Sequence, residues 1–311
     1  MSTVDPISTA GADRPRRSPR SRRLRGGAAG RAAVSLRGSA TVLPLILFVV
    51  VAFGVPAVAM AYGAFTTNTP GTPATYTSGN LSASLSGGYL TALLGSVKLS
   101  ATSALVATVV GLLLAQAVVT SRFKVLRSVV LSASGVLANF GGVPLAFAFI
   151  ATLGNAGVLT THLHLDKAGW SLYTFWGLTL VYLYFLIPLM VLSVIPALDG
   201  LRRQWREAAQ NNGATTWQYW RHVALPVLAP SLLGGFVLLF GTAFAAYATA
   251  AAMVGASVPL ITLQIANALN GNVSADAGNV ALAMSLDMVV IAALVMAVYL
   301  PLQRRSARWL V

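Results

Sequence analysis

The sequence is built from six apolar blocks of about twenty to thirty residues, separated by shorter polar segments. About twenty helical residues, at ~1.5 Å each, cross the ~30 Å hydrocarbon core of a bilayer. The blocks are apolar all around rather than along one amphipathic stripe, which is typical of membrane helices. We therefore predict an all-α membrane protein with six transmembrane helices, at about residues 41–65, 99–119, 129–153, 173–198, 225–254 and 280–302.

The first 40 residues differ from the rest of the chain. Nine arginines lie within the first 37 residues, separated mainly by Ser, Pro, Gly and Ala. Such a segment has too few apolar residues to fold, so we predict a disordered arginine-rich tail at 1–40 and one transmembrane domain at 41–311. A formal net charge of +14 would suggest a nucleic-acid partner for a soluble protein. Because the charge gathers beside a predicted span, we expect contact with membrane lipid and no nucleic acid.

The basic residues also predict which way the chain crosses the membrane. Of the 21 Lys and Arg, nine lie in the tail, three in the turn near 120–128, four in segment 199–224 and three after the sixth block. With six spans these four segments share one side, and the positive-inside rule makes that side the cytoplasm. We therefore expect cytoplasmic N- and C-termini. The alternative is a signal peptide cleaved near "AVA" at 57–59, but the apolar block is too long and contains that site.

Several classes of function find no support in the sequence. No Gly-rich loop is followed by Gly-Lys-Ser or Gly-Lys-Thr, so no phosphate-binding loop of an ATPase is encoded. The chain has three histidines and no cysteine, and no cluster with metal-ligand spacing. We expect no cofactor, no metal and no catalytic residues.

The polar segment 199–224 contains the only glutamate of the chain, Glu207. We predict a helix that begins at Asp199 as its N-cap and ends before Gly213, a residue suited to a left-handed stop. On this helix Trp205, Ala208 and Ala209 fall on one face, where the small alanines permit another surface to approach closely.

A second short helix is predicted to follow. Thr215 and Gln218, three residues apart, form the pattern of a capping box, and the helix that they open runs into Leu225 and Pro226. An amphipathic loop that only rests on lipid would have a similar pattern.

The spacing in this segment resembles the EAA loop of binding-protein-dependent ABC importer permeases. The matching positions are Glu207, Ala208, Ala209, Gly213, Leu225 and Pro226. The family prefers isoleucine where this chain has Val223. The resemblance extends in topology from about Leu99 to Leu302 and implies the six-helix fold of type I ABC importers, the MetI-like family.

The resemblance also implies a role and partners. The loop 199–224 would couple transport to a pair of cytoplasmic ATP-binding subunits, which hydrolyse the ATP. A second permease subunit, identical or paralogous, and an extracytoplasmic solute-binding protein would complete a transporter in the bacterial inner membrane. Permeases for polyamines, thiamine, phosphonates or ferric ion look most similar, and the solute itself is not specified.

Polar groups inside spans are costly, so each is a candidate for the substrate path. Asp287 in the sixth block either faces this path or is a structural acid bonded to a Ser, Thr or Tyr of a neighbouring helix. Four further candidates share a position in apolar blocks rich in small residues: Asn139, Thr242, Tyr247 and Thr249. Close helix packing is the alternative explanation for the small residues around them.

Two other classes of protein remain as alternatives. A secondary transporter driven by an ion gradient predicts several intramembrane charges and an internal repeat, whereas this chain has one such acid and no visible repeat. A membrane scaffold would not need Glu207 and Gly213 at this spacing.

Overall fold

The computed structural model describes residues 43–67, 75–165, 167, 169–255, 257–271 and 277–307, with side chains as far as residue 303. The predicted tail at 1–40 lies outside these residues. The chain divides into two compact units, Met1–Pro56 and Ala57–Val311. In the first unit the described residues are helical and include a π-helix, η1 (Val50–Gly54).

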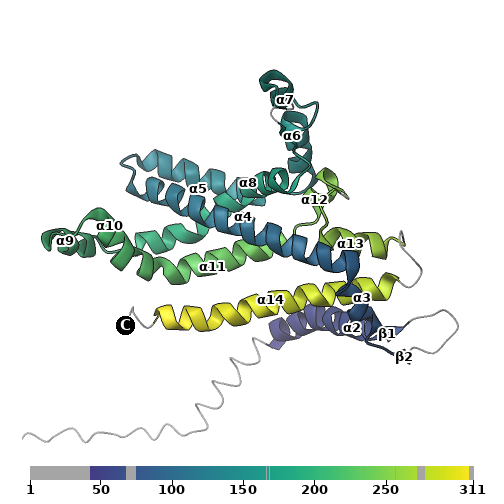
Figure 1. Cartoon of the computed structure of the whole chain (residues 1–311). Helices are drawn as coiled ribbons and strands as arrows, with labels where there is room; N and C mark the ends of the chain where they lie inside the picture. Colours follow the sequence, from purple (N-terminus) through teal and green to yellow (C-terminus); the bar gives the residue numbers. More distant parts are fainter. Residues whose placement is uncertain are drawn as a thin grey trace, which may run out of the picture. The chain divides into compact units, whose positions relative to one another are not determined.

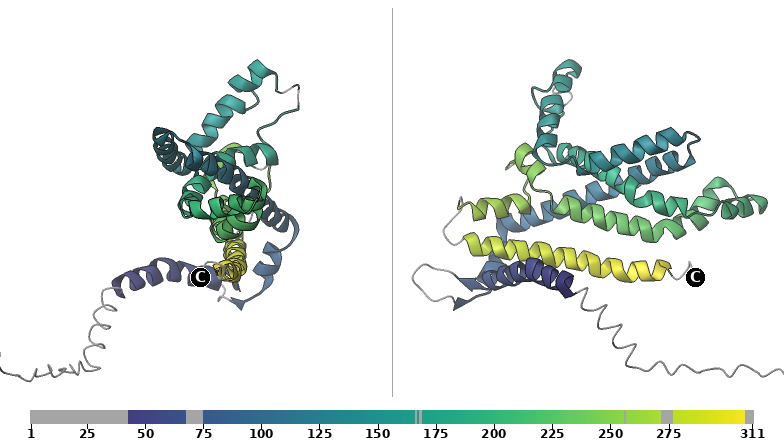
Figure 2. Two further views of the ribbon diagram at one scale, coloured as in Figure 1. Left: turned by 90° about the vertical axis from the view of Figure 1, so that its left-hand side faces the viewer. Right: turned by 180° about the vertical axis from the view of Figure 1, so that it is seen from behind.

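The second unit is a bundle of helices (Figures 1 and 2). Helix α2 (Val55–Ala64) enters it, and a two-stranded antiparallel sheet follows, in which β1 (Thr66–Thr67) pairs with β2 (Thr75–Tyr76). The remaining helices are α3 (Gly79–Ser84), α4 (Gly87–Thr120), α5 (Lys124–Asn139), α6 (Val143–Leu153), α7 (Val158–Leu163), α8 (Phe175–Asp199), α9 (Arg203–Asn211), α10 (Thr216–Tyr219), the π-helix η2 (Trp220–Ala224), α11 (Leu225–Phe244), α12 (Ala248–Met253), α13 (Ile261–Leu269) and α14 (Ala277–Ala307).

Helix α8 is the centre of the bundle and packs against α4, α5 and α11. Helix α4 buries a series of small residues within the bundle: Ser96, Ser100, Ser103, Ala104, Ala107, Gly111 and Ala115. The two helices approach closely at Gly111, where an added Cβ would lie 2.6 Å from Cβ of Met190 on α8. Small residues thus let these helices pack without intervening side chains, as in other membrane bundles.

A polar network joins the ends of α2 and α3 to α14. The side-chain amides of Asn80 and Asn279 both donate to the carbonyl oxygen of Thr66, at 2.9 and 2.8 Å. The Thr66 hydroxyl donates to Tyr62 O at 3.0 Å. These bonds fix the start of the short sheet against the first turn of α14.

Six helices in the described part of the chain are long and apolar enough to cross a membrane. They are Leu43–Ala64, Gly87–Thr120, Val143–Leu163, Phe175–Asp199, Thr216–Phe244 and Ala277–Gln303. The predicted number of spans and the all-α class are therefore confirmed, but several predicted boundaries are wrong.

The second span begins at Gly87, twelve residues before the predicted Leu99, because a polar stretch with Tyr89, Ser96 and Lys98 continues the helix. The third predicted span, 129–153, is two helices, α5 and α6. They are separated at 140–142, where Gly142 has φ +78°. Only glycine adopts that conformation readily, and Pro144 then begins the next helix.

The fifth predicted span, 225–254, is also interrupted. The helix starts earlier, at Thr216, and ends at Phe244, and 248–253 form the separate helix α12. The predicted helix from Asp199 is wrong as well. Asp199 is the last residue of α8 and forms an ion pair with Arg127 of α5, while α9 begins only at Arg203.

Candidate functional site

The loop between α8 and α11 lies at the same end of the second unit as the α4–α5 turn and the C-terminal end of α14 (Figures 1 and 2). It consists of the short helix α9 and, after Gly213, the helical turn α10, which continues through η2 into α11. Gly213 has φ +77°, so the predicted left-handed stop is confirmed. The N–H of Gly213 donates to Gln210 O at 2.9 Å and the N–H of Ala214 to Ala209 O at 3.0 Å. Both bonds of a Schellman motif are therefore present, and they satisfy carbonyls at the end of α9.

The predicted capping box at the start of α10 is also confirmed. The Gln218 N–H donates to the Thr215 hydroxyl at 3.3 Å, and the Thr215 N–H donates to Gln218 Oε1 at 2.7 Å. The chain is thus fixed on both sides of Gly213 by local hydrogen bonds, so that α9 and α10 are held at one defined angle.

The only glutamate of the chain is exposed on α9. Its Oε1 lies 3.0 Å from Nε of Arg203, four residues earlier on the same helix. Such an exposed pair contributes little stability, ~0.3–0.5 kcal/mol, so it leaves Glu207 available to a partner. Ala208 is exposed beside it, while Trp205 and Ala209 are half-buried.

The turn that leads from the loop into α11 is wider than an α-helical turn. In η2 the Leu225 N–H donates to Trp220 O, five residues earlier. Pro226 follows directly; it has no N–H, and its ring excludes the usual approach of the carbonyl four residues before it. Leu225 and Pro226, two of the motif positions, therefore mark the place where the loop joins the membrane-spanning part of α11.

The polar residues proposed for the substrate path do not form one site. Thr249 is buried on α12; its hydroxyl accepts from the Gly142 N–H at 2.9 Å and donates to Gly142 O at 3.3 Å. Asn139 ends α5 nearby and donates to Gly135 O at 2.9 Å. Tyr247 is 44% exposed in the break between α11 and α12. These three residues border the two helix breaks.

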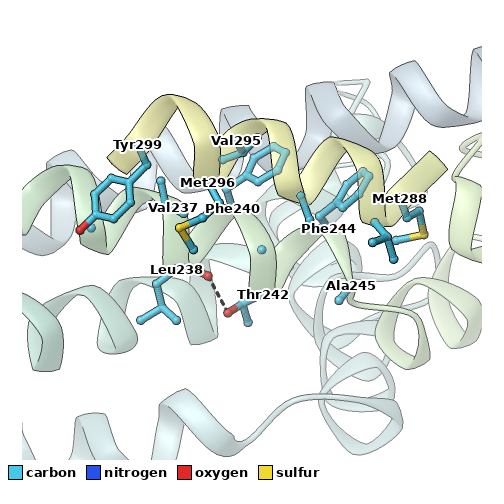
Figure 3. A pocket seen from close by; sticks show the side chains of 14 residues that line it. Val237, Leu238, Phe240, Thr242, Phe244, Ala245, Met288, Val295, Met296 and Tyr299 are labelled. Atoms are coloured by element: carbon cyan, nitrogen blue, oxygen red, sulfur yellow. Dashed lines mark hydrogen bonds between the residues drawn. The ribbon is translucent and has the colours of Figure 1, made fainter. Parts of the chain in front are cut away.

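Thr242 lies elsewhere, on a groove between α11 and α14 (Figure 3). The groove has a volume of about 660 Å³ and is lined mainly by apolar side chains, among them Phe240, Phe244 and Met288. The Thr242 hydroxyl donates to Leu238 O of its own helix at 2.8 Å, as the dashed line in Figure 3 shows. The Thr242 hydroxyl is thus hydrogen-bonded within its own helix.

Asp287 is 8% exposed and does not line this groove. Its Oδ2 accepts a hydrogen bond of 2.7 Å from the hydroxyl of Ser84, at the end of α3. A serine of a neighbouring helix is the partner that the structural interpretation of Asp287 requires. A role in the substrate path stays a prediction.

Sequence reasoning missed the residues that hold the helix break at 245–247. The hydroxyl of Tyr182 on α8 donates to Ala246 O at 3.1 Å, and Tyr182 is almost completely buried. Ser96 on α4 similarly accepts from the Ile261 N–H at 2.9 Å, at the start of α13. A polar side chain inside an apolar block was the available signal for both. Within the described residues no group of three or more His, Asp or Glu side chains could hold a metal ion.

Comparison with known proteins shows the family of the chain. The family model described as the binding-protein-dependent transport system inner membrane component matches residues 107–308. The chain belongs to this family. It is a multi-pass membrane protein, since its family is one of inner-membrane components and six of its helices are long and apolar enough to span.

Individual relatives agree with this placement. The sulfate transport system permease protein CysT of Escherichia coli is 40% identical over 68 residues, which are 22% of this chain and 24% of that protein. The chain thus spans about a quarter of that relative's length. The molybdenum transport system permease protein ModB of Mycobacterium bovis is 29% identical over 66% of this chain and 76% of that protein.

A solved structure shows the same fold. It is a bacterial alginate ABC transporter in complex with an alginate pentasaccharide-bound periplasmic protein. The matched chain has a TM-score of 0.66 at 17% identity, and the match covers 88% of this chain and 96% of that one. The predicted fold of an ABC importer permease is therefore confirmed.

Proposed function

We propose that this chain is the transmembrane permease subunit of an ATP-driven importer. It forms the translocation path for a small polar solute and couples that path, through the loop 199–224, to a separate ATPase. The observation that carries the proposal is the loop itself. Two short helices are locked by a Schellman motif and a capping box on either side of Gly213, and they lead directly into the membrane-spanning helix α11.

This geometry is suited to transmitting movement from a bound protein to the membrane-spanning helix α11. The loop exposes Glu207, Ala208 and Trp217 at the end of the bundle, so a protein that binds there can displace α11 along its length. The partners that follow are a pair of cytoplasmic ATP-binding subunits, which hydrolyse the ATP, a second permease subunit and an extracytoplasmic solute-binding protein. The loop-bearing end then faces the cytoplasm.

Docking of α9 on the ATPase is tested by cross-linking. The chain has no cysteine, so Ala208→Cys introduces its only thiol. In the assembled transporter this thiol should cross-link to a cysteine in the ATPase's docking groove. Thr75→Cys in β2, at the opposite end of the second unit, is the matched control and should not cross-link. Equal cross-linking from both positions would refute the docking.

The role of the loop's angle is tested at Gly213. An added Cβ would meet no atom within 4 Å, so only the left-handed backbone opposes a side chain there. Gly213→Val should destabilise the left-handed backbone conformation at this position by ~1–2 kcal/mol. It should therefore abolish solute-stimulated ATP hydrolysis and uptake. Gly213→Asn is the control, because asparagine tolerates this conformation, and it should retain most coupling. Full coupling in Gly213→Val would refute the hypothesis that the angle between α9 and α10 transmits the ATPase's movement to α11.

A further inference from the structure

A cavity of about 610 Å³ lies between the loop and the ends of two spans. Its wall is formed by the last turns of α4 and α8, by α9 and by the start of η2. Its lining residues are Gln116, Val119, Thr120, Leu198, Leu201, Arg202, Arg203, Arg206, Glu207, Gln210, Tyr219 and Trp220. Since α4 and α8 end here as membrane spans, the cavity lies at the level where lipid headgroups begin.

The charge of the lining is positive. The lining includes three arginines and one carboxylate, and that carboxylate is paired with Arg203. Arg202 lies over the ring of Trp205, with its Cζ 5.9 Å from the ring centroid. Among the described side chains, neither Arg202 nor Arg206 forms a salt bridge with a carboxylate. Two positive charges on the lining therefore have no carboxylate partner among the side chains that the structure describes.

A tyrosine on the cavity lining points to the same kind of ligand. Tyr219 is 8% exposed and packs edge to face on Trp220, with ring centroids 6.5 Å apart. It lines the cavity, so its hydroxyl can donate to a group bound there. The side-chain amides of Gln116 and Gln210 lie on the same lining and supply further donors.

From these observations we infer that the cavity between α9 and the ends of α4 and α8 binds a phosphate group, with Arg202, Arg206 and Tyr219 as its donors. Guanidinium and hydroxyl donors around one cavity suit the several oxygens of a phosphate. The headgroup of an anionic phospholipid is the nearest source, because the cavity lies at the ends of the spans. A bound phosphate would link α9 to α4 and α8, which the loop's own hydrogen bonds do not do.

The test uses the full chain purified with its partner subunits and stripped of lipid. Binding of short-chain phosphatidylglycerol is measured by native mass spectrometry without ATP or solute, with phosphatidylcholine and inorganic phosphate as separate arms. Arg202→Gln with Arg206→Gln should weaken phosphatidylglycerol binding by roughly ten- to thirty-fold, since each replacement exchanges a charge-assisted hydrogen bond to the phosphate for a neutral one. Tyr219→Phe should weaken it about threefold.

The matched control is Arg122→Gln with Arg221→Gln, which removes the same charge outside the cavity lining. It should change binding by less than about twofold, because neither side chain lines the cavity and so neither donates a charge-assisted hydrogen bond to a phosphate bound there. Preference for phosphatidylglycerol over phosphatidylcholine identifies the lipid as the source, and binding of inorganic phosphate alone identifies a free anion. The inference is overturned if no arm binds, or if the control variant loses as much affinity as the cavity variant. Because no ATP is present, either result is independent of the coupling role proposed above.

Discussion

The bond between Thr249 and Gly142 gives the most direct prediction on stability. It joins α12 to the break between α5 and α6, segments 107 residues apart in the chain. Thr249→Val keeps the side-chain volume, so no cavity forms, but the Gly142 N–H loses its acceptor. An unpaired buried N–H costs ~1–3 kcal/mol. Gly142 is only half-buried, and the second bond is long at 3.3 Å, so we expect a loss of ~1–2 kcal/mol in the free energy of unfolding.

The measurement is denaturant unfolding of the purified chain in lipid–detergent bicelles. Thr242→Val is the matched control, because the Thr242 hydroxyl bonds only to its own helix at Leu238 O. That carbonyl keeps its helical partner, so the control should change stability by less than ~0.5 kcal/mol. Thr249→Ser restores the hydroxyl and should recover most of the loss. Equal losses in both valine variants, or none in Thr249→Val, would refute the reasoning.

Three further predictions follow from other contacts. In a double-mutant cycle, Ser84→Ala and Asp287→Asn should show a coupling free energy of ~1–3 kcal/mol, because Ser84 donates to the Asp287 carboxylate; a coupling near zero would contradict this bond. Gly177→Ala should lower the thermal stability of the purified chain, since its Cβ would lie 2.1 Å from Leu172 O, whereas Gly88→Ala, which meets no atom within 4 Å, should not. Reporters fused after residues 124 and 212 should report the cytoplasm and one after residue 78 the outside; a cytoplasmic signal after residue 78 would contradict the orientation.

The stop at Gly213 and the helix start at Thr215 could be predicted because the structure there is local. Gly213, Thr215 and Gln218 act on backbone groups within five positions of themselves, so their pattern in the sequence is sufficient to place a stop and a start. The number of spans was likewise readable, since it depends on apolar length alone.

What could not be predicted depends on partners distant in the chain. Nothing in "FAAYA" at 244–248 interrupts a helix by itself. The break there is accompanied by the Tyr182 hydroxyl, which binds the Ala246 carbonyl from another helix. Asp199 failed as a helix cap for a related reason: an ion pair with Arg127, 72 residues away, competes for its carboxylate.

The choice for Asp287 was open for the same reason. An acid in an apolar block requires either a partner or a water-filled space, and the sequence does not show that the Ser84 hydroxyl donates to Asp287. Ser84 belongs to a short helix that the hydropathy pattern does not show.

The wide turn at Trp220–Ala224 bears on how this loop is compared with those of relatives. A π-turn holds one more residue than an α-turn, and one residue corresponds to about 100° of rotation around a helix. A homologue that lacks the extra residue would present the same side chains of α10 on a different side of α11. A single-residue gap in an alignment between Thr216 and Pro226 therefore implies a different orientation of the loop. The gap should be placed at the wide turn, which the hydrogen bond from Leu225 N to Trp220 O marks, rather than by residue similarity.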